Sequence, residues 1–238
     1  MGKNYPSKLT KDIHRLFDPL LQRHSKWQAF SDFLIMTACA ISNSVDIKNY
    51  EMREKQYMDV VKKYTSQELD LFAQILAELI NVMGQCVQDG NLKDILGVLF
   101  HELKLHNERK GQFFTPQEIS DMIAIMTMGD ITPEVEQHGF FAVAEPSCGS
   151  GDMMISAANA TQRAGYNYCT QMVVDCTDID ISCVHMCYIQ LSYYGIPAVV
   201  RHGNTLLLEV WSSWYTTIFM AEGWCWKYRR SSLLSEVV

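Results

Sequence analysis

Hydrophobic residues recur every three or four positions through residues 8–106, which is the spacing of amphipathic helices. The first predicted helix starts near Leu9, and Pro19 marks a kink or a break in it. Capping pairs mark the starts of two more helices: Ser25 with Gln28, and Thr65 with Glu68. A last helix carries the apolar positions Leu92, Ile95, Leu96, Leu99, Phe100 and Leu103. Short polar links between such helices favour a helical bundle domain, which we place at residues 1–107.

The pattern changes after the polar stretch His106–Gly111. A helix is predicted to run to about Met128 from an N-cap Thr, a first-turn Pro and a capping-box Glu, at Thr115, Pro116 and Glu118. Beyond it, strands are predicted at 140–144, 172–177, 198–201 and 216–220, and helices at 152–164 and 182–194. Strands that alternate with helices in this way indicate a parallel sheet, so residues 108–238 are predicted to form an α/β domain.

The composition is that of a folded protein. Hydrophobic residues make up 48% of the chain and charged residues 20%, which is enough for a sizeable core. No apolar run reaches the roughly 18–20 residues of a membrane helix, and the first ten residues lack the apolar core of a signal peptide. We therefore expect a soluble, cytoplasmic protein with no membrane partner.

The net charge of −7 is unevenly distributed. Residues 1–110 hold 15 Lys and Arg against 14 Asp and Glu, whereas residues 111–238 hold 5 against 13. Before its last dozen residues, the second segment has only Arg163 and Arg201 as basic residues. Because a nucleic-acid surface needs clustered positive charge, the C-terminal half alone is a poor candidate for binding DNA.

The eight cysteines form neither a CxxC motif nor the spacing of a disulfide framework or a zinc ribbon. Cys183 and Cys187 lie four residues apart on a predicted helix, with His185 between them. Buried small side chains explain this spacing better than a metal site does. The histidines show no ligand spacing either, and we expect no metal.

Three segments that follow predicted strands carry candidate ligand-binding residues. They are Glu145-Pro-Ser-Cys-Gly149-Ser-Gly151-Asp152, Thr177-Asp178-Ile179-Asp180 and Gly203-Asn204-Thr205. The carboxyl ends of parallel strands meet at one edge of an open sheet, where ligands bind. The glycines let the backbone approach a ligand, Asp178 can accept hydrogen bonds from ribose hydroxyls, and the Asn204 amide can pair with an adenine edge. The alternative is an ordinary turn with a solvated acid and an Asn cap.

Four motifs together resemble the adenine-specific N6 DNA methylases, in particular the modification subunit of type I restriction systems. They are GQFFTP from Gly111, EPSCGSGDMM from Glu145, TDID from Thr177 and HGNTL from His202. The resemblance covers roughly residues 100–210. It implies a class I, Rossmann-like methyltransferase sheet after the helical domain. It also implies the cofactor S-adenosylmethionine (SAM) and the family activity of site-specific adenine methylation in DNA.

The resemblance assigns cofactor-binding roles residue by residue. The residues that match the motif closing over the methionine end of SAM are Phe114, Thr115 and Pro116. Those that match the Gly-loop motif are Glu145, Pro146, Gly149, Gly151 and Asp152. Asp178 matches the acid that binds ribose, Ile179 lies beside the adenine, and Asn204 stands where the family places an Asp or Asn that reads adenine N6.

The family's catalytic motif, Asn-Pro-Pro-Tyr/Phe, is not found in the sequence. The six prolines lie at 6, 19, 116, 133, 146 and 197, so no two are adjacent. No asparagine follows Asn204 either. In this family the motif holds the amine of a flipped adenine, so we assign no catalytic residue. Family members also use a later recognition region or a separate specificity subunit, and we expect the chain to be too short to hold one.

Two hypotheses remain. The first is SAM-dependent methyl transfer to DNA adenine, alone or with a partner chain. The second, favoured for the isolated chain, is a non-catalytic SAM-binding module that assembles with a restriction or modification complex. DNA is an expected partner, reached through a partner subunit or an oligomer.

Overall fold

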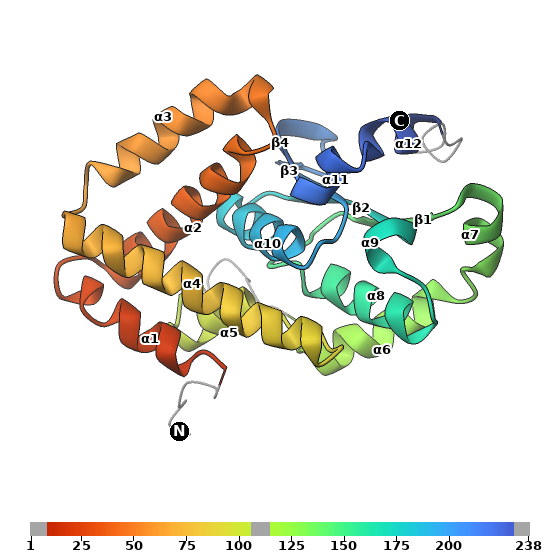
Figure 1. The fold of residues 1–238 in the computed structure, drawn as a ribbon, viewed down its shortest axis with the longest axis horizontal. Coiled ribbons are helices and arrows are strands. Elements are labelled where there is room, and N and C mark those ends of the chain that lie inside the picture. Colours follow the sequence, from red (N-terminus) through yellow and green to blue (C-terminus); the bar gives the residue numbers. More distant parts are fainter. Residues whose placement is uncertain (1–8, 106–114, 231–238) are drawn as a thin grey trace.

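A helical region is followed by an α/β region with a mostly parallel sheet, so the predicted fold class is confirmed (Figure 1). The computed structural model describes residues 9–105 and 115–230, with side chains to 227. The elements of the helical region are α1 (Lys11–Phe17), η1 (Leu20–Gln22), α2 (Lys26–Asn43), η2 (Ile47–Asn49), α3 (Tyr50–Val61), α4 (Ser66–Gln88) and α5 (Ile95–Glu102). The break predicted at Pro19 is confirmed, since α1 ends before it and η1 follows it.

The N-caps predicted at Ser25 and Thr65 are confirmed, and the full capping box, with bonds in both directions, is recorded for Thr65 with Glu68. The Ser25 hydroxyl accepts a hydrogen bond from the Gln28 N–H at the start of α2 (3.1 Å). At the start of α4, the Thr65 hydroxyl accepts from the Glu68 N–H (3.3 Å) and the Glu68 carboxylate accepts from the Thr65 N–H (2.8 Å). These bonds satisfy N–H groups that have no partner within the helix.

The α/β region is built on a four-stranded sheet of order β1-β2-β3-β4. Its elements are α6 (Gln117–Met128), α7 (Thr132–His138), β1 (Phe141–Glu145), α8 (Asp152–Arg163), α9 (Tyr168–Gln171), β2 (Met172–Asp178), α10 (Ile181–Tyr193), β3 (Ala198–Asn204), β4 (Glu209–Tyr215), α11 (Thr217–Ala221) and α12 (Trp224–Arg230). Strands β1, β2 and β3 are parallel, and β4 runs antiparallel to β3. The predicted parallel core of the sheet is therefore confirmed, with an antiparallel strand at one edge.

Two local predictions are wrong. The strand predicted at 216–220 is the helix α11, because the buried Thr216 hydroxyl bonds to the backbone of Ile196 and Ala198 and ends the strand there. The fourth strand is β4 instead. The start of α6 also differs: Pro116 has extended backbone (ψ 138°) and takes the N-cap position, so Thr115 caps nothing.

Hydrophobic side chains cover both faces of the sheet. On one face, a large cluster joins α8 and α10 to the helices of the N-terminal region. On the other, a small cluster of five buried residues includes Phe219 of α11 and Trp224 of α12. Because the large cluster runs through both regions, α2 and α5 pack on α10 as parts of one core. The domain boundary between 107 and 108 stays a prediction.

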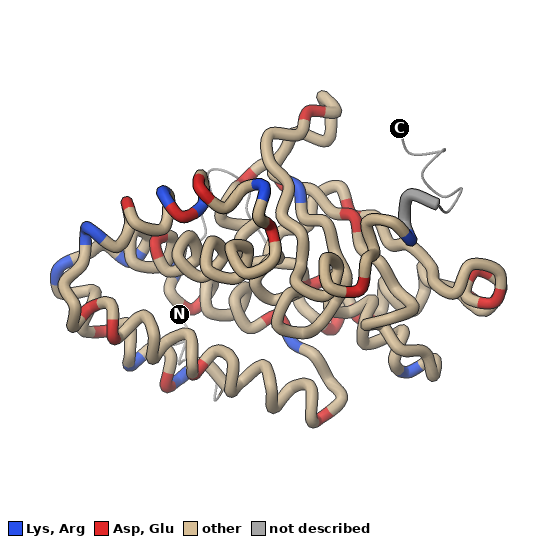
Figure 2. Tube along the Cα trace, turned by 45° about the horizontal axis from the view of Figure 1, so that its top comes forward, with Lys and Arg blue, Asp and Glu red and all other residues tan. Residues whose placement is uncertain are grey.

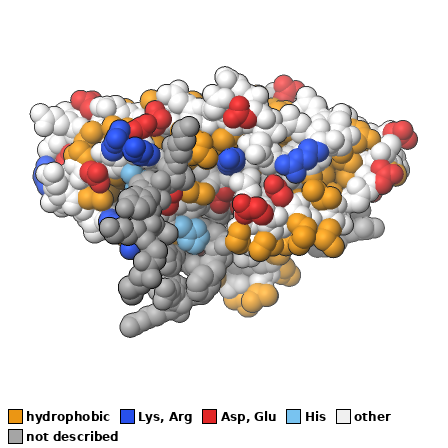
Figure 3. Space-filling view, turned by 90° about the horizontal axis from the view of Figure 1, so that it is seen from below, with side chains coloured by type: hydrophobic (Ala, Val, Ile, Leu, Met, Phe, Trp, Pro, Cys, Tyr) orange, Lys and Arg blue, Asp and Glu red, His pale blue; other side chains and the backbone are white. Residues whose placement is uncertain are grey.

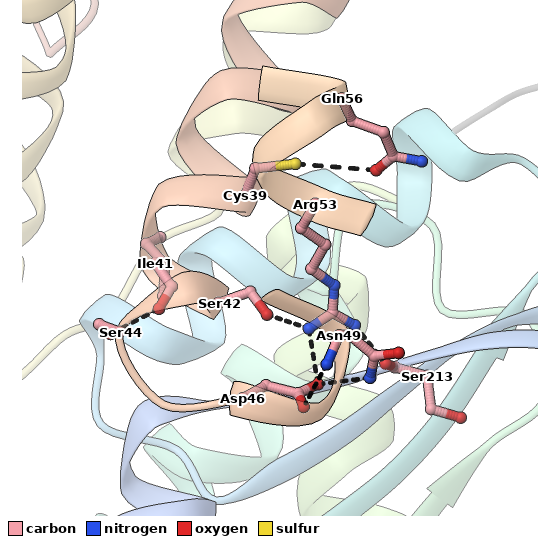
Figure 4. A network of polar contacts seen from close by, with 9 residues as sticks. All are labelled: Cys39, Ile41, Ser42, Ser44, Asp46, Asn49, Arg53, Gln56 and Ser213. Carbon is pink, nitrogen blue, oxygen red and sulfur yellow. Dashed lines mark hydrogen bonds and ion pairs between the residues drawn. The ribbon is translucent and has the colours of Figure 1, made fainter. Parts of the chain in front are cut away.

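Arg53 of α3 links the helical region to the sheet edge (Figure 4). Its guanidinium is buried, donates to the Asp46 carboxylate (2.7 Å) and to the Ser213 carbonyl oxygen of β4 (2.8 Å), and also contacts Ser42. It lies over the ring of Trp214, 4.1 Å from the centroid. A buried charge is tolerated only when it is paired and hydrogen-bonded, so this network fixes α3 against β4.

Of the described helices, only α4 is long and apolar enough, by length and composition, to cross a membrane. Its buried residues Phe72, Ile75, Leu79 and Met83 recur at helical spacing and join the core. This is the pattern of an amphipathic helix with one face in the core of a folded domain.

Helix α6 packs on α8 through one face. Its opposite face presents exposed hydrophobic side chains: Ile119, Met122, Ile125 and Met126. Hydrophobic groups are also visible on the face of the molecule seen in Figure 3. The described part of the chain leaves this side of α6 uncovered.

Replacing Thr65 with Ala is expected to lower the free energy of unfolding by about 1 kcal/mol, because the capping box of α4 loses its hydroxyl acceptor. Urea denaturation of the full chain measures this. The exposed neighbour Ser66 provides the control, since Ser66→Ala removes no cap and should change stability by less than about 0.5 kcal/mol. Equal effects of the two substitutions would show that the box contributes nothing.

Candidate cofactor site

A cavity of about 770 Å³ lies at the carboxyl ends of the parallel strands. Its walls come from the loop after β1, from the turn between β2 and α10, and from α2, which contributes Trp27, Ser31 and Ile35. Cavities of this size hold cofactors and other small molecules, and this edge of an open sheet is where they bind. The cavity therefore lies at the strand ends, where the sequence predicts a ligand site.

The loop after β1 is the Gly loop, residues 146–151. Gly149 and Gly151 have φ of 53° and 101°, a conformation that favours glycine. A Cβ on Gly151 would also lie 3.0 Å from the Cys187 sulfur of α10, which is tighter than nine in ten real Cβ contacts. The Cys148 N–H donates to the Thr177 carbonyl oxygen (2.9 Å), which fastens the loop to the end of β2. The loop backbone therefore lies directly over the strand ends.

Asp178 ends β2 and lines the cavity. One carboxylate oxygen accepts from the Gly149 N–H (2.9 Å), and the other accepts from the Asp180 N–H (2.8 Å). The side chain is buried, and burial raises its pKa above the ordinary value. Each oxygen of a carboxylate has more than one acceptor site, so both can still accept a hydrogen bond from a ligand.

Asp152 begins α8 and also lines the cavity. Only 6% of the residue is exposed, and neither carboxylate oxygen has a hydrogen-bond partner among the described residues. Burial, and to a lesser extent the neighbouring charges of Asp94 and Asp121, raise its pKa to about 7, while the nearby Ser120 hydroxyl acts in the opposite direction. Such a group is stabilised when a cation or a hydrogen-bond donor enters beside it.

The charge of the cavity selects among ligands. Three carboxylates line it, those of Asp152, Asp178 and Asp180, and none of the described lining residues is Lys or Arg. His185 lines it as well, and burial lowers the pKa of its imidazole to about 3, so the ring is neutral. The phosphates of a dinucleotide would meet an acidic lining here, whereas a cationic ligand is attracted. Figure 2 shows that the basic residues gather mainly on the N-terminal helices.

Some of the residues predicted to bind the cofactor line the cavity: Thr115, Gly149, Asp152, Asp178 and Ile179. Pro116, Glu145, Pro146 and Gly151 are not among its lining residues, although each is within two positions of one that is. The Glu145 carboxylate accepts from the Ser147 N–H (2.9 Å), and the Pro146 carbonyl oxygen accepts from the Thr205 hydroxyl (2.7 Å), so both shape the Gly loop. Phe114 lies outside the described residues.

Asn204 is placed differently. Its side-chain oxygen accepts from the Leu206 N–H (3.1 Å) and the Leu207 N–H (3.2 Å), which closes the turn between β3 and β4. It is not among the residues that line the cavity. This geometry matches the alternative interpretation, in which Asn204 caps a turn. The contact of Asn204 with adenine stays a prediction.

Sequence reasoning missed the cavity wall formed by α2. Trp27, Ser31 and Ile35 lie one turn apart on that helix and face the Gly loop across the cavity. The 44% exposure of Trp27 is unusual for so large an apolar side chain. The periodicity of α2 alone does not distinguish a cavity wall from core. His185 and His202 were not assigned to the site either, although His202 begins the HGNTL motif and His185 lies between Cys183 and Cys187.

The model of the family described as N-6 DNA Methylase matches residues 90–222, which is more than half of the chain. The chain therefore belongs to the N-6 DNA methylase family, and the resemblance seen in its motifs is confirmed. The match begins at residue 90 and so includes α5, whose N-cap Asp94 accepts a hydrogen bond from the Ser150 hydroxyl of the Gly loop (2.5 Å).

Among solved structures, the chain is similar to the methyltransferase subunit of a type I restriction-modification system from Streptococcus thermophilus. The two are 13% identical with a TM-score of 0.38, and the similarity covers 83% of this chain. The chain spans 58% of the length of that subunit. No curated protein matches the chain.

Proposed function

We propose that the chain binds SAM in the cavity between the Gly loop and α2. The observation that carries this proposal is the acidic lining, with the buried and unpartnered carboxylate of Asp152. SAM carries a sulfonium, an ammonium and a carboxylate group, so its net positive charge fits a cavity that has carboxylates and lacks Lys and Arg among its described residues. The residues present therefore fit this cofactor, which supplies an activated methyl group when it is bound.

Each residue has a role that follows from its contacts. Asp178, held by two backbone N–H groups, accepts the ribose hydroxyls. Asp152 faces the cationic methionine portion, and its pKa falls when that charge is bound. Ile179 is 61% exposed and offers an apolar surface to the adenine. The glycines of the Gly loop leave room for the cofactor beside the backbone.

For catalysis, we favour a cytoplasmic SAM-binding module that assembles with a partner chain of a DNA-modification complex. The family's base-gripping motif is expected on the segment after Asn204. There the chain instead turns through Leu206–Leu208 into the antiparallel β4 and then enters α11. Among the described residues of that segment, no side-chain amide and aromatic ring lie together in a position to hold a flipped adenine. The runner-up is methyl transfer to adenine in DNA by the chain itself.

Titration calorimetry of the full chain with SAM tests the binding proposal. We expect one SAM per chain with micromolar affinity, and no binding of NAD, because its phosphates meet the acidic lining. Circular dichroism verifies that the sample is folded. A folded sample that binds NAD but not SAM, or neither, contradicts the proposal.

A methyl-transfer assay tests the second part. Unmethylated DNA is incubated with the chain and with SAM labelled in its methyl group, and we expect no incorporation above a blank without protein. Incorporation that is abolished by Asp178→Ala would establish the runner-up function instead. Activity from a contaminating methylase can be recognised, because it would be the same in the wild-type and Asp178→Ala preparations.

A further inference from the structure

Three cysteines from three different elements meet beneath the Gly loop. Cys148 belongs to the loop, Cys176 to β2 and Cys187 to α10. Their sulfur atoms all lie within 4.8 Å of one another, and none of the residues is more than 5% exposed. The sequence analysis noted Cys183 and Cys187 four residues apart on one helix and favoured buried small side chains over a metal site. The structure instead turns Cys187 toward Cys148 and Cys176, whereas Cys183 lines the cavity.

We infer that Cys148, Cys176 and Cys187 form a three-thiolate site for a soft d10 cation such as Zn²⁺ or Cu(I). Metal–sulfur bonds of ~2.3 Å at trigonal or tetrahedral angles separate the sulfurs by about 3.8–4.0 Å. The Cys176 and Cys187 sulfurs are 3.8 Å apart. They already have the separation that a shared cation requires.

The same distance argues against a disulfide. A sulfur–sulfur bond is ~2.05 Å long, so a strand and a helix packed in the core would have to move together. A cation needs no such movement. Each thiol releases its proton to solvent and forms one bond to the metal, and no oxidant takes part. Sulfur-only ligands select soft cations over Mg²⁺ or Ca²⁺, which prefer oxygen.

The site is reachable although it is buried. Cys148 lines the 770 Å³ cavity, so an ion can enter from that side. A bound cation would tie the Gly loop to β2 and α10. The backbone at Gly151 already approaches the Cys187 sulfur closely. The cation would therefore stabilise the conformation of the Gly loop, and this role does not depend on SAM binding.

Cadmium is the probe, because thiolate-to-Cd²⁺ charge transfer absorbs in the ultraviolet. The full chain is reduced with a phosphine, freed of metal and titrated with Cd²⁺. We expect one equivalent to bind with the absorbance of three thiolates and to raise the melting temperature. Cys148→Ser, Cys176→Ser and Cys187→Ser are each expected to weaken binding at least tenfold. Cys86→Ser removes a buried thiol outside the cluster and should leave binding unchanged.

A measurement on the wild type covers the case in which a variant fails to fold. Mass spectrometry after alkylation should show that Cd²⁺ protects Cys148, Cys176 and Cys187 together, and not Cys86. Zn²⁺ and Cu(I) are then added as competitors, and displacement of Cd²⁺ by either supports the inference. A folded wild type that shows no thiolate–cadmium absorbance, or a site that neither competitor empties, overturns it.

Discussion

Replacing Asp178 with Ala is expected to lower the affinity for SAM about 100-fold, which corresponds to about 2.7 kcal/mol. The carboxylate is the proposed acceptor for the ribose hydroxyls, and a hydrogen bond to a charged group contributes about 1.5–3 kcal/mol. The substitution also leaves the Gly149 N–H without its acceptor, which loosens the Gly loop. Titration calorimetry near pH 7.5 measures the change.

Two further variants separate binding from general damage. Asp178→Asn keeps one carbonyl oxygen as an acceptor, so its affinity should lie between those of the wild type and the Ala variant. Asp175 lies three residues earlier on β2, and its carboxylate binds Arg201 at 2.8 and 2.5 Å, away from the cavity. Asp175→Asn should bind SAM normally. An Asp178→Ala protein that binds within threefold of the wild type removes Asp178 from the site.

Burial raises the pKa of Asp178, and this gives the affinity a pH dependence of known sign. The ionised carboxylate accepts two hydrogen bonds from ribose, whereas the protonated form has lost acceptor capacity. SAM affinity should therefore decrease as the pH falls, starting at a higher pH than for an ordinary aspartate. The Asp178→Asn protein should lack this part of the pH dependence.

The part of the site that rests on strand ends could be predicted from the sequence. Glycines and an acid after two successive apolar runs place Gly149 and Asp178 at one sheet edge, because parallel strands end together. Helix starts were equally local, as Ser25 and Thr65 show, since a cap needs only residues three positions away. These features depend on short stretches of chain, so the sequence pattern contains them.

The remaining features depend on contacts between distant segments. The turn before β4 has no Gly or Asn-Gly signal; it uses the Asn204 side chain and a left-handed Leu208 (φ 56°), so the hairpin was not visible in the pattern. The short segment 216–220, two threonines followed by three apolar residues, fits a strand and a helix equally well. The wall formed by α2 and the meeting of Cys148, Cys176 and Cys187 follow from tertiary packing, which periodicity does not encode.

Replacing Asp152 with Asn is expected to stabilise the folded chain at alkaline pH while weakening SAM binding about tenfold. The sign follows from the pKa, which is about 7 in the folded protein and 3.8 in the reference state. As the pH rises from 4 to 7, the unfolded chain ionises first, and the folded state loses about 1.4 kcal/mol of stability per pH unit, at most about 4 kcal/mol in total. The Asn side chain does not ionise and avoids this loss.

The size of the expected stability change also depends on the amide that replaces the carboxylate in Asp152→Asn. Burying an amide without a partner costs roughly 1–3 kcal/mol, so the Asp152→Asn protein should match the wild type near pH 5 and exceed it by about 2 kcal/mol at pH 8. Urea denaturation at the two pH values measures this, with the exposed Asp70→Asn as the control. An equal difference between wild type and variant at both pH values would show that Asp152 does not titrate in this range. A variant that is more stable at pH 8 and also binds SAM more weakly would show that this buried carboxylate costs stability because it serves a cationic ligand.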